Sequence, residues 1–427
     1  MVTALAIEFV DELADGTKGA ALPLIRADLG LSYAQIGLLI SVPLLVGSLI
    51  ELPLGLVAGQ GRTRHRLVLA GGMVVAASLA AVAAAHSVTV LLVAFVAFFP
   101  ASGAFVSLTQ AALMDAAPGR HQQRMAAWNL AGSAGAVGGP LLLAGVLAVG
   151  GGWRMAYLLL AATAGAALAV AFIAAPSRPP AAASRRPPAV PGHGVAPATP
   201  TTVAPGGEEV AGGEEGAAPS SEDDGEENGG RTSVREAARA LRDGDVARWV
   251  VLLEVCDLLL DVLTGYIGVY LVDVAGASPA EAAVGVAVRL AGGLAGDALF
   301  VLVSRRVSGP AALRFSAVTA AILYPAFLLV PWLPAKLVIL AVLSLATACW
   351  YPVVQAGLYT ALPGRSGVAV FLSSAAGLLG AAGPLAVGFI AQQAGLTWAL
   401  AALAAAPTAV LVILPPRARP RLRRVKR

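Results

Sequence analysis

Twelve apolar segments, six on either side of a polar stretch, make up most of this chain of 427 residues. Each is about 18–25 residues long, the length that an α-helix needs to cross a lipid bilayer. With 58% hydrophobic and 13% charged residues, the composition is that of a membrane protein, since soluble domains are about 45–50% apolar. The pattern predicts an all-α membrane protein with twelve transmembrane helices as two pseudo-symmetric six-helix bundles. The segments lie near residues 2–26, 33–58, 67–86, 88–115, 122–149, 153–174, 247–273, 279–303, 310–331, 335–361, 366–393 and 397–414.

The polar stretch separates the two sets of segments and predicts four parts in the chain. Residues 175–245 are first rich in proline and alanine and then acidic, a composition that cannot bury enough apolar surface to fold. We therefore predict a cytoplasmic disordered linker, ending in a short amphipathic helix on the membrane surface that begins with the capping pair Ser233 and Glu236. The predicted parts are a bundle over 1–174, the linker over 175–245, a bundle over 246–414 and a basic cytoplasmic tail over 415–427.

The two sets of segments carry the same acidic residues at a constant offset. Glu8, Asp11 and Asp15 lie in the first segment, and 246 residues later the seventh contains Glu254, Asp257 and Asp261. The same offset relates Glu51 to Asp297, and Gln110 is followed by Gln355 at an offset of 245. Spacings of three and four place each trio on one helical face, and an ionisable group at the centre of a membrane helix costs about 2.5–3.5 kcal/mol. The repetition of so costly a pattern predicts a duplicated bundle with a polar site between its halves.

Charge and cysteine usage narrow the classes of function. Arginines gather in alternate short loops and in the tail, which places both termini and the linker in the cytoplasm and the chain in the inner (plasma) membrane. This uneven distribution, with a net charge of only +4, argues against a nucleic-acid partner. The two cysteines lie inside apolar segments and support neither a disulfide framework nor a metal site. No cofactor is expected, and the expected partners are a small-molecule substrate, protons and the lipid bilayer, with the chain acting as a monomer.

Three motifs resemble those of a known family. The segment GLVAGQGRTRHR, residues 55–66, is similar to the loop 2–3 signature of the major facilitator superfamily, although glycine stands where that signature usually has aspartate. The run GAVGGP, residues 135–140, is similar to part of the helix-5 signature of proton-driven drug antiporters, without its trailing glycine pair. The opening acid followed by PLIRADLGLSYAQIGLLIS resembles the fosmidomycin-resistance branch of efflux carriers.

The resemblance implies a central cavity lined by the first helix of each three-helix repeat, and hence roles for the repeated acids. Asp15 and Asp261 are then expected near mid-membrane, facing one another as proton-coupling groups, because burial disfavours the charged form of a carboxylate. Lys18, three residues after Asp15, is close enough for an ion pair that would hold Asp15 ionised and leave the proton to Asp11 or Asp261. Asp11 and Asp257 extend the relay, Glu51 and Asp297 form a second symmetric pair, and the two glutamates Glu8 and Glu254 are interfacial.

Other residues are candidates for substrate binding and gating. Arg289 lies well inside an apolar segment, where it either pairs with an acid of the seventh helix or binds an anionic group of the substrate. The remaining substrate-binding candidates are neutral hydrogen-bonding and aromatic side chains: Gln110, Gln355, Trp350, Tyr351 and Tyr359. The gating candidates are loop charges and the helix-5 motif: Arg62, Arg64, Asp115, Arg120, Gly135, Gly139 and Pro140.

The leading hypothesis is secondary active transport, specifically proton-coupled efflux of a small drug-like or metabolite molecule. Proton-coupled or facilitative uptake of a small solute is the alternative within transport. A non-transporting membrane sensor is an alternative of another class, although the acidic linker is unlike a folded sensory domain. An enzyme is not expected, because no Ser/His pair shares a helical face and no histidine lies mid-span beside the acids.

Overall fold

The fold is seen in a computed structural model that describes residues 1–57, 62–115, 121–173, 236–304, 306–362 and 366–414. Every regular element in these ranges is helical. The first half contains α1 (Val2–Leu29), α2 (Tyr33–Val57), α3 (Arg62–Ala83), α4 (Val88–Asp115), α5 (His121–Ala148) and α6 (Trp153–Ile173). The second half contains α8 (Gly244–Asp273), α9 (Pro279–Val303), α10 (Gly309–Leu329), α11 (Leu333–Thr347), α12 (Trp350–Ala361), α13 (Ser366–Gly380), α14 (Gly383–Ala394), α15 (Leu396–Ala402) and α16 (Ala405–Ile413).

These helices form twelve passes of membrane-spanning length in two bundles of six. In the first half each pass is one helix, whereas the last three passes of the second half are each divided, into α11 and α12, α13 and α14, and α15 and α16. Ten passes within the described ranges are apolar enough to cross a bilayer, and α1 and α8 are as long but carry the repeated acids. The predicted twelve-helix membrane fold is therefore confirmed.

The start of the second helix in each half preserves the duplication at atomic detail. At α2, the backbone N–H of Gln35 donates to the Ser32 hydroxyl at 3.2 Å, and the Gln35 side chain accepts from the backbone N–H of Ser32 at 2.9 Å. At α9, Ser278 and Glu281 make the same reciprocal bonds, at 3.3 and 2.8 Å. Both are capping boxes that satisfy otherwise unpaired N–H groups at a helix start. The constant offset between the halves thus reflects repeated local structure.

Within the first half, α1 and α5 pack closely because glycines face one another. A Cβ atom on Gly139 of α5 would lie 2.6 Å from the backbone nitrogen of Thr17 on α1, and one on Gly16 would collide with the backbone of Ala136. Gly135 likewise faces the backbone at Phe9. Small residues at such positions allow two membrane helices to approach to backbone contact. The motif at residues 135–140 therefore holds α1 against α5.

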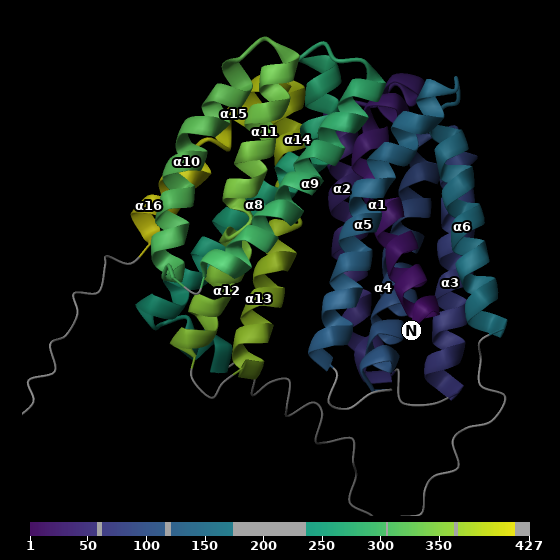
Figure 1. Cartoon of the computed structure of the whole chain (residues 1–427), viewed down its shortest axis with the longest axis horizontal. Helices are drawn as coiled ribbons and strands as arrows, with labels where there is room; N and C mark the ends of the chain where they lie inside the picture. The colour runs from purple at the N-terminus through teal and green to yellow at the C-terminus, as the bar shows by residue number, and fades with distance from the viewer. Residues whose placement is uncertain (58–61, 116–120, 174–235, 305, 363–365, 415–427) are drawn as a thin grey trace, which may run out of the picture.

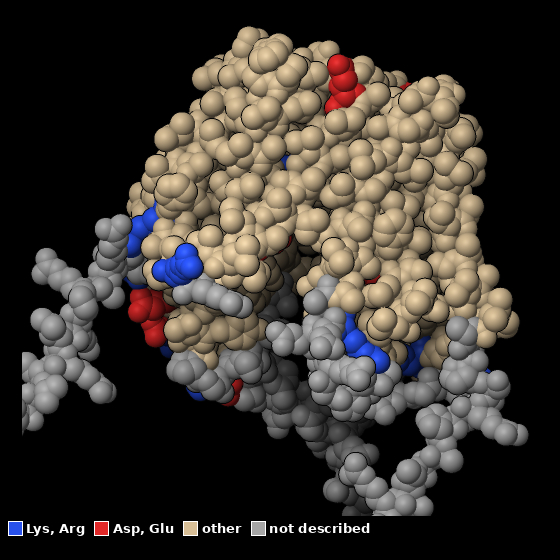
Figure 2. Space-filling model, in the orientation of Figure 1, with Lys and Arg blue, Asp and Glu red and all other residues tan. Residues whose placement is uncertain are grey.

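The two halves meet at one end of the molecule and separate toward the other (Figure 1). Contacts between the halves of the described chain run through at least four pairs of helices, α2 with α14, α5 with α9, α1 with α8 and α1 with α9. We call the joined end, at the top of Figure 1, the closed end. Figure 2 shows the molecule hollowed between the halves at the opposite end, which we call the open end. The chain begins at the open end (Figure 1).

The last part of the predicted linker packs against the second bundle. Residues 236–240 are helical, and Ala237 and Ala240 are buried in a cluster with Leu358 and Leu362 near the end of α12 and with residues of α13. The two alanines are small enough to let this turn lie against the bundle. The rest of the predicted linker and the tail over 415–427 lie outside the described residues.

Candidate functional site

The first wall of the site is the acidic face of α1. The Ser102 hydroxyl of α4 donates a hydrogen bond of 2.6 Å to the carboxylate of Asp11. One turn further, the ammonium of Lys18 pairs with Asp15 at 2.6 Å and lies 4.4 Å from the centre of the Phe99 ring. The pair expected from the spacing of Asp15 and Lys18 is therefore present. The Asp15 side chain is 53% exposed although it lies in the middle of a long helix, because it faces the cleft between the halves.

The second wall is the corresponding face of α8. Asp261 is exposed at mid-helix and lies in the electrostatic field of Asp15 and Lys18, which belong to the other half, and of Arg289 on α9. Asp261 makes no hydrogen bond or ion pair with any residue in the described ranges. Toward the open end, Asp257 is half-buried and interacts electrostatically with Tyr351 of α12. Asp15 and Asp261 thus belong to different halves and interact electrostatically with one another.

Arg289 lies behind Asp261, at the junction of α9 with α8. Its side chain is 7% exposed, and its Nη2 donates to the backbone carbonyl of Leu260 at 3.2 Å and to the Thr264 hydroxyl at 3.1 Å. Its Nε is buried without a hydrogen-bond partner among the described residues, none of whose carboxylates forms an ion pair with it. Arg289 thus binds neutral groups of the seventh helix directly, and it interacts electrostatically with Asp261 of the same helix.

Charged and aromatic side chains join the halves at the closed end. Arg26 of α1 forms an ion pair of 2.9 Å with Asp273 of α8, and its guanidinium stacks 4.4 Å from the centre of the Tyr33 ring. The Tyr33 hydroxyl donates to the same carboxylate at 3.0 Å, while the Tyr33 backbone N–H donates to the side chain of Gln392 on α14 at 3.1 Å. Arg26, Tyr33, Asp273 and Gln392, which we call the closure cluster, thus bridge the halves.

A second layer of contacts lies beneath the closure cluster. The Ser41 hydroxyl of α2 accepts from the backbone N–H of Leu385 at 3.0 Å, and the buried Tyr266 hydroxyl donates to the carbonyl of Pro384 at 2.8 Å. Gly37 of α2 permits this approach, because a Cβ atom there would lie 2.8 Å from the Pro384 carbonyl oxygen. The cleft is therefore sealed at the closed end by backbone contact as well as by charge.

Two further basic residues at this end, Arg154 and Lys336, have specific partners. Arg154 pairs with Asp28 at 2.5 Å and donates to the carbonyl of Ala85, both within the first half. Lys336 is 2% exposed, and its ammonium donates to the Tyr270 hydroxyl and to the carbonyls of Phe327 and Leu328. Lys336 thus caps the end of α10, where a cation is favourable to the helix dipole.

The other substrate-binding candidates lie in different surroundings from one another. Gln110 donates to the sulfur of Met125 at 3.6 Å, and Gln355 exchanges hydrogen bonds of 3.1 Å with Ser373, so each amide joins adjacent helices within its own half. Trp350 is fully buried. Its indole N–H donates to the Ser316 hydroxyl on α10 at 2.6 Å, which directs the ring into the bundle.

Among the aromatic candidates on α12, only the two tyrosines are available to a ligand. The exposed fractions of Tyr351 and Tyr359 are 50% and 39%, and Tyr351 interacts electrostatically with both Asp257 and Tyr359. We retain Tyr351 and Tyr359 as the aromatic side chains of the candidate site. Trp350 is left out of it.

Several predicted residues are only partly covered by the structure. Glu51 lies on α2, Arg62 on α3 and Asp115 on α4, but their side chains are outside the described part of the chain, as is all of Arg120. Arg64 is half-buried and has an interaction partner, and Asp297, the partner expected for Glu51, is exposed on α9. Pro140 is buried inside α5, following the glycines that contact α1.

The prediction of site residues rested on acids that recur in both halves of the sequence, so it missed acids that occur in one half alone. Glu12 of α1 is half-buried and interacts electrostatically with Asp11 and Asp15, but the equivalent position on α8 is Leu258. The closure cluster was missed for a different reason, because its contacts join residues that are hundreds of positions apart. Glu12 could have been predicted, because it is an acidic residue inside the first apolar segment. No pattern in the sequence pairs Arg26 with Asp273.

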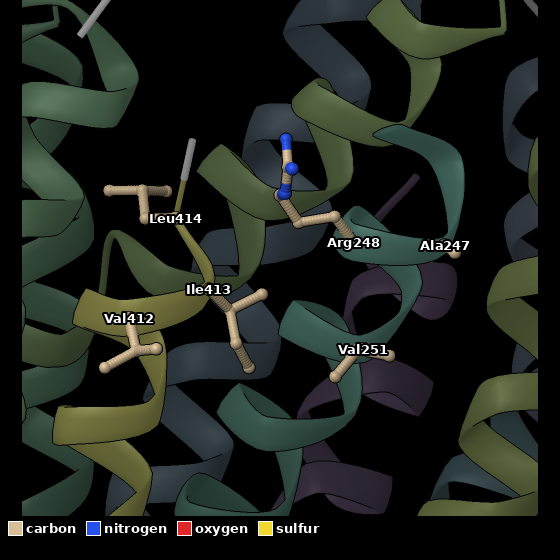
Figure 3. A pocket seen from close by; sticks show the side chains of 6 residues that line it. All are labelled: Ala247, Arg248, Val251, Val412, Ile413 and Leu414. Carbon is tan, nitrogen blue, oxygen red and sulfur yellow. The ribbon is translucent and has the colours of Figure 1, made fainter. Parts of the chain in front are cut away.

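Two further cavities lie outside the cleft. One has a volume of about 410 Å³ and is lined by Ala247, Arg248 and Val251 of α8 and by Val412, Ile413 and Leu414 at the end of α16 (Figure 3). The other, of about 610 Å³, lies among the ends of α8, α9, α10 and α12. Both belong to the second half alone, so neither has the acids of the two facing walls.

The arrangement of two six-helix bundles around a charged cleft agrees with the protein family that the sequence matches. A family profile described as Major Facilitator Superfamily matches residues 5–360. The chain belongs to the major facilitator superfamily. It is a multi-pass membrane transporter rather than an enzyme. The family match does not distinguish the fosmidomycin-resistance branch, and no curated protein matches the sequence.

Solved transporter structures share this superfamily fold at low sequence identity. A bacterial homolog of the human lysosomal transporter Spinster, in an inward-facing and unoccupied conformation, has a TM-score of 0.68 at 16% identity, covering 97% of this chain and 98% of the other. The nucleoside transporter NupG has a TM-score of 0.70 at 12% identity, covering 97% of each chain. A POT family transporter in complex with 5-aminolevulinic acid has a TM-score of 0.68 at 11% identity, covering 96% and 94%. Identities this low establish the fold alone.

Proposed function

We propose that this chain is a proton-coupled exporter of a small molecule and that Asp261 is the group that binds the transported proton. The observation that carries the proposal is the position of Asp261 in the cleft, facing Asp15 and Lys18 across the two halves without an ion-pair partner among the described residues. A carboxylate that lines the cleft and has no ion pair within the described ranges is suited to gain and lose a proton during transport.

The neighbouring acids are less suited to this role because each has a partner. Lys18 forms an ion pair with Asp15 at 2.6 Å, and Ser102 donates to Asp11 at the same distance. Asp257 is the next acid on α8 and extends the path from Asp261 toward the open end. We therefore assign the proton to Asp261, with Asp257 and Asp11 as relay groups.

Alternating access follows from the two ends of the cleft. The arginines of the loops beside the open end favour a cytoplasmic position for it, and both termini lie on that side in the proposal. The closure cluster then seals the cleft from the outside, and its separation would open the cleft outward. Movement of one bundle against the other around a fixed central site is the general mechanism for such a pseudo-symmetric pair.

Export, rather than uptake, is favoured by the partial antiporter motif of residues 135–140, which packs α5 against the acidic helix α1. Any rotation of α1 about its axis must therefore move α5 with it. A movement of α1 that follows protonation in the cleft would therefore be transmitted through α5 to the interface between the halves, where α5 contacts α9.

The decisive experiment measures the collapse of a respiration-driven pH gradient in everted vesicles as cationic, neutral, anionic and zwitterionic compounds are added. Collapse by one class of compound is expected, with a loss of at least about tenfold in Asp261→Asn. Asp245→Asn is the matched control, because it removes an acid of the same helix that pairs with Arg248 at the surface. Solute entry into intact cells without gradient collapse would instead establish uptake.

A further inference from the structure

Arg289 is a buried cation that forms no ion pair within the described ranges, although Asp261 lies in its electrostatic field. Its side chain is 93% buried, yet Nη2 contacts only a carbonyl and a hydroxyl, and Nε has no described partner. A buried guanidinium without a carboxylate is costly, and membrane proteins place such groups where they pair or act on a ligand. Its fork of N–H donors matches a carboxylate. The unfilled donor thus indicates an anionic group in the ligand.

The cleft beside Arg289 has the opposite charge. Asp261 adjoins Leu260, whose carbonyl holds the Arg289 guanidinium, and faces the other half, where Lys18 neutralises Asp15. Asp261 is therefore the acid of the central layer that remains available to a cationic group. A molecule with charges of both signs would satisfy Arg289 and Asp261 together, whereas a simple cation would leave the buried Nε of Arg289 without a hydrogen-bond acceptor.

Aromatic surface completes the lining of the site. Tyr351 and Tyr359 are exposed, Tyr351 interacts electrostatically with Asp257, and Phe99 lies beneath Lys18 on the other wall. Rings that flank the charged layer favour a ligand with an apolar portion, as in most small-molecule sites, where a few polar groups orient a ligand held by apolar walls.

We infer that the substrate is a small zwitterion with an apolar side chain, whose carboxylate binds Arg289 and whose ammonium group binds Asp261. This inference rests on the proposed transport function and names its substrate class. The ammonium group and the transported proton then compete for one carboxylate, because a protonated Asp261 no longer attracts a cation. Release of the substrate as Asp261 gains a proton is the exchange that an antiporter requires.

The test uses the full-length purified protein and three compounds on one frame. Phenylalanine is the zwitterion, N-acetylphenylalanine the matched anion and phenylalaninamide the matched cation, and leucine with its two derivatives forms a second set. Thermal stability in detergent is measured against the concentration of each compound. We expect the two zwitterions to stabilise the protein, with at least tenfold weaker binding of their derivatives.

Variants separate the role of Arg289 from a purely structural one. Arg289→Gln is expected to weaken binding of the zwitterions at least tenfold, and Arg289→Lys, which keeps the charge, is expected to fold and to retain part of the affinity. Arg248→Gln removes an arginine outside the cleft and should leave binding unchanged. Two outcomes would overturn the inference. One is that the cationic compounds, phenylalaninamide and leucinamide, stabilise the protein as much as the zwitterions do. The other is that neither zwitterion stabilises it.

The failure of this inference is distinguishable from the failure of the proposed function. If the cationic derivatives collapse the pH gradient in everted vesicles and the zwitterions do not, then the substrate class is wrong and proton-coupled export stands. If no compound of any charge class moves in either direction, then the proposed transport function itself is wrong.

Discussion

Arg26 of the first half and Asp273 of the second half are joined by an ion pair of 2.9 Å at the closed end of the molecule. Tyr33 contacts both partners, through its ring on the arginine and its hydroxyl on the carboxylate. Because each half contributes at least one group, this cluster must separate before the cleft can open at that end. The ion pair therefore contributes to the equilibrium between the two access states rather than to the stability of either bundle.

Asp273→Asn is expected to favour opening at the closed end. Partly exposed ion pairs contribute about 1 kcal/mol or less, which corresponds to a shift of roughly fivefold in the equilibrium. Spin labels at the exposed positions Val149 and Trp332, in a protein without its two cysteines, would report the distance between the halves. Asp28→Asn is the matched control, because it removes an ion pair within the first half at the same end. Equal distance distributions in Asp273→Asn and the unsubstituted protein would contradict the prediction.

Gly139→Ala is expected to lower thermal stability, because the added methyl group would lie 2.6 Å from the backbone nitrogen of Thr17. Overpacking of this kind costs about 1–3 kcal/mol. Gly145→Ala on the same helix has no heavy atom within 4 Å of the new Cβ and should be neutral or stabilising by up to about 1 kcal/mol. Unfolding temperatures measured in detergent would compare the two variants, and equal values would show that α1 and α5 can move apart without cost.

The fold was predictable from the sequence because the length of an apolar segment is a local property. Segments near 2–26 and 153–174 correspond closely to α1 and α6. Each break in the second half precedes a proline, Pro352, Pro384 or Pro407, which lacks the N–H for the helical bond one turn earlier. A proline alone did not predict a break, because Pro100 and Pro140 lie inside the continuous helices α4 and α5. The interruption between α11 and α12 accompanies tertiary hydrogen bonds, since Ser316 of α10 donates to the carbonyl of Ala346.

The charged residues of the site and their pairing within a helix were predictable from the sequence, whereas the direction in which an aromatic side chain points was not. Spacing alone gave the ion pair of Lys18 with Asp15, because neighbours three residues apart meet on a helix. The direction of Trp350 could not be read in the same way, since α12 is apolar on several faces and its register against α10 depends on packing. The aromatic cluster expected on one surface is therefore divided between the cleft and the bundle interior.

Lys336→Met is expected to destabilise the second half. The substitution keeps most of the side-chain volume but leaves the carbonyls of Phe327 and Leu328 without their charged donor. A buried acceptor that loses its partner costs about 1–3 kcal/mol, and the loss should appear as a lower unfolding temperature in detergent. Lys336→Arg retains the charge and serves as the control, although its larger head group must adapt to the site. An unchanged unfolding temperature in Lys336→Met would show that water replaces the ammonium group.

Deletion of residues 180–230 is expected to leave transport nearly unchanged, because this acidic and proline-rich sequence lacks both spanning and packing character. The segment that follows behaves differently. Ala237 is buried against Leu358 and Leu362, so Ala237→Glu would place a charge in an apolar contact and should lower stability by about 1–3 kcal/mol. Ala238→Glu, on the exposed side of the same turn, is the matched control. Transport assays and unfolding temperatures on the three variants would show where the predicted linker ends and the packed second bundle begins. A large loss of transport in the deletion variant at normal expression would show that the acidic segment itself takes part in function.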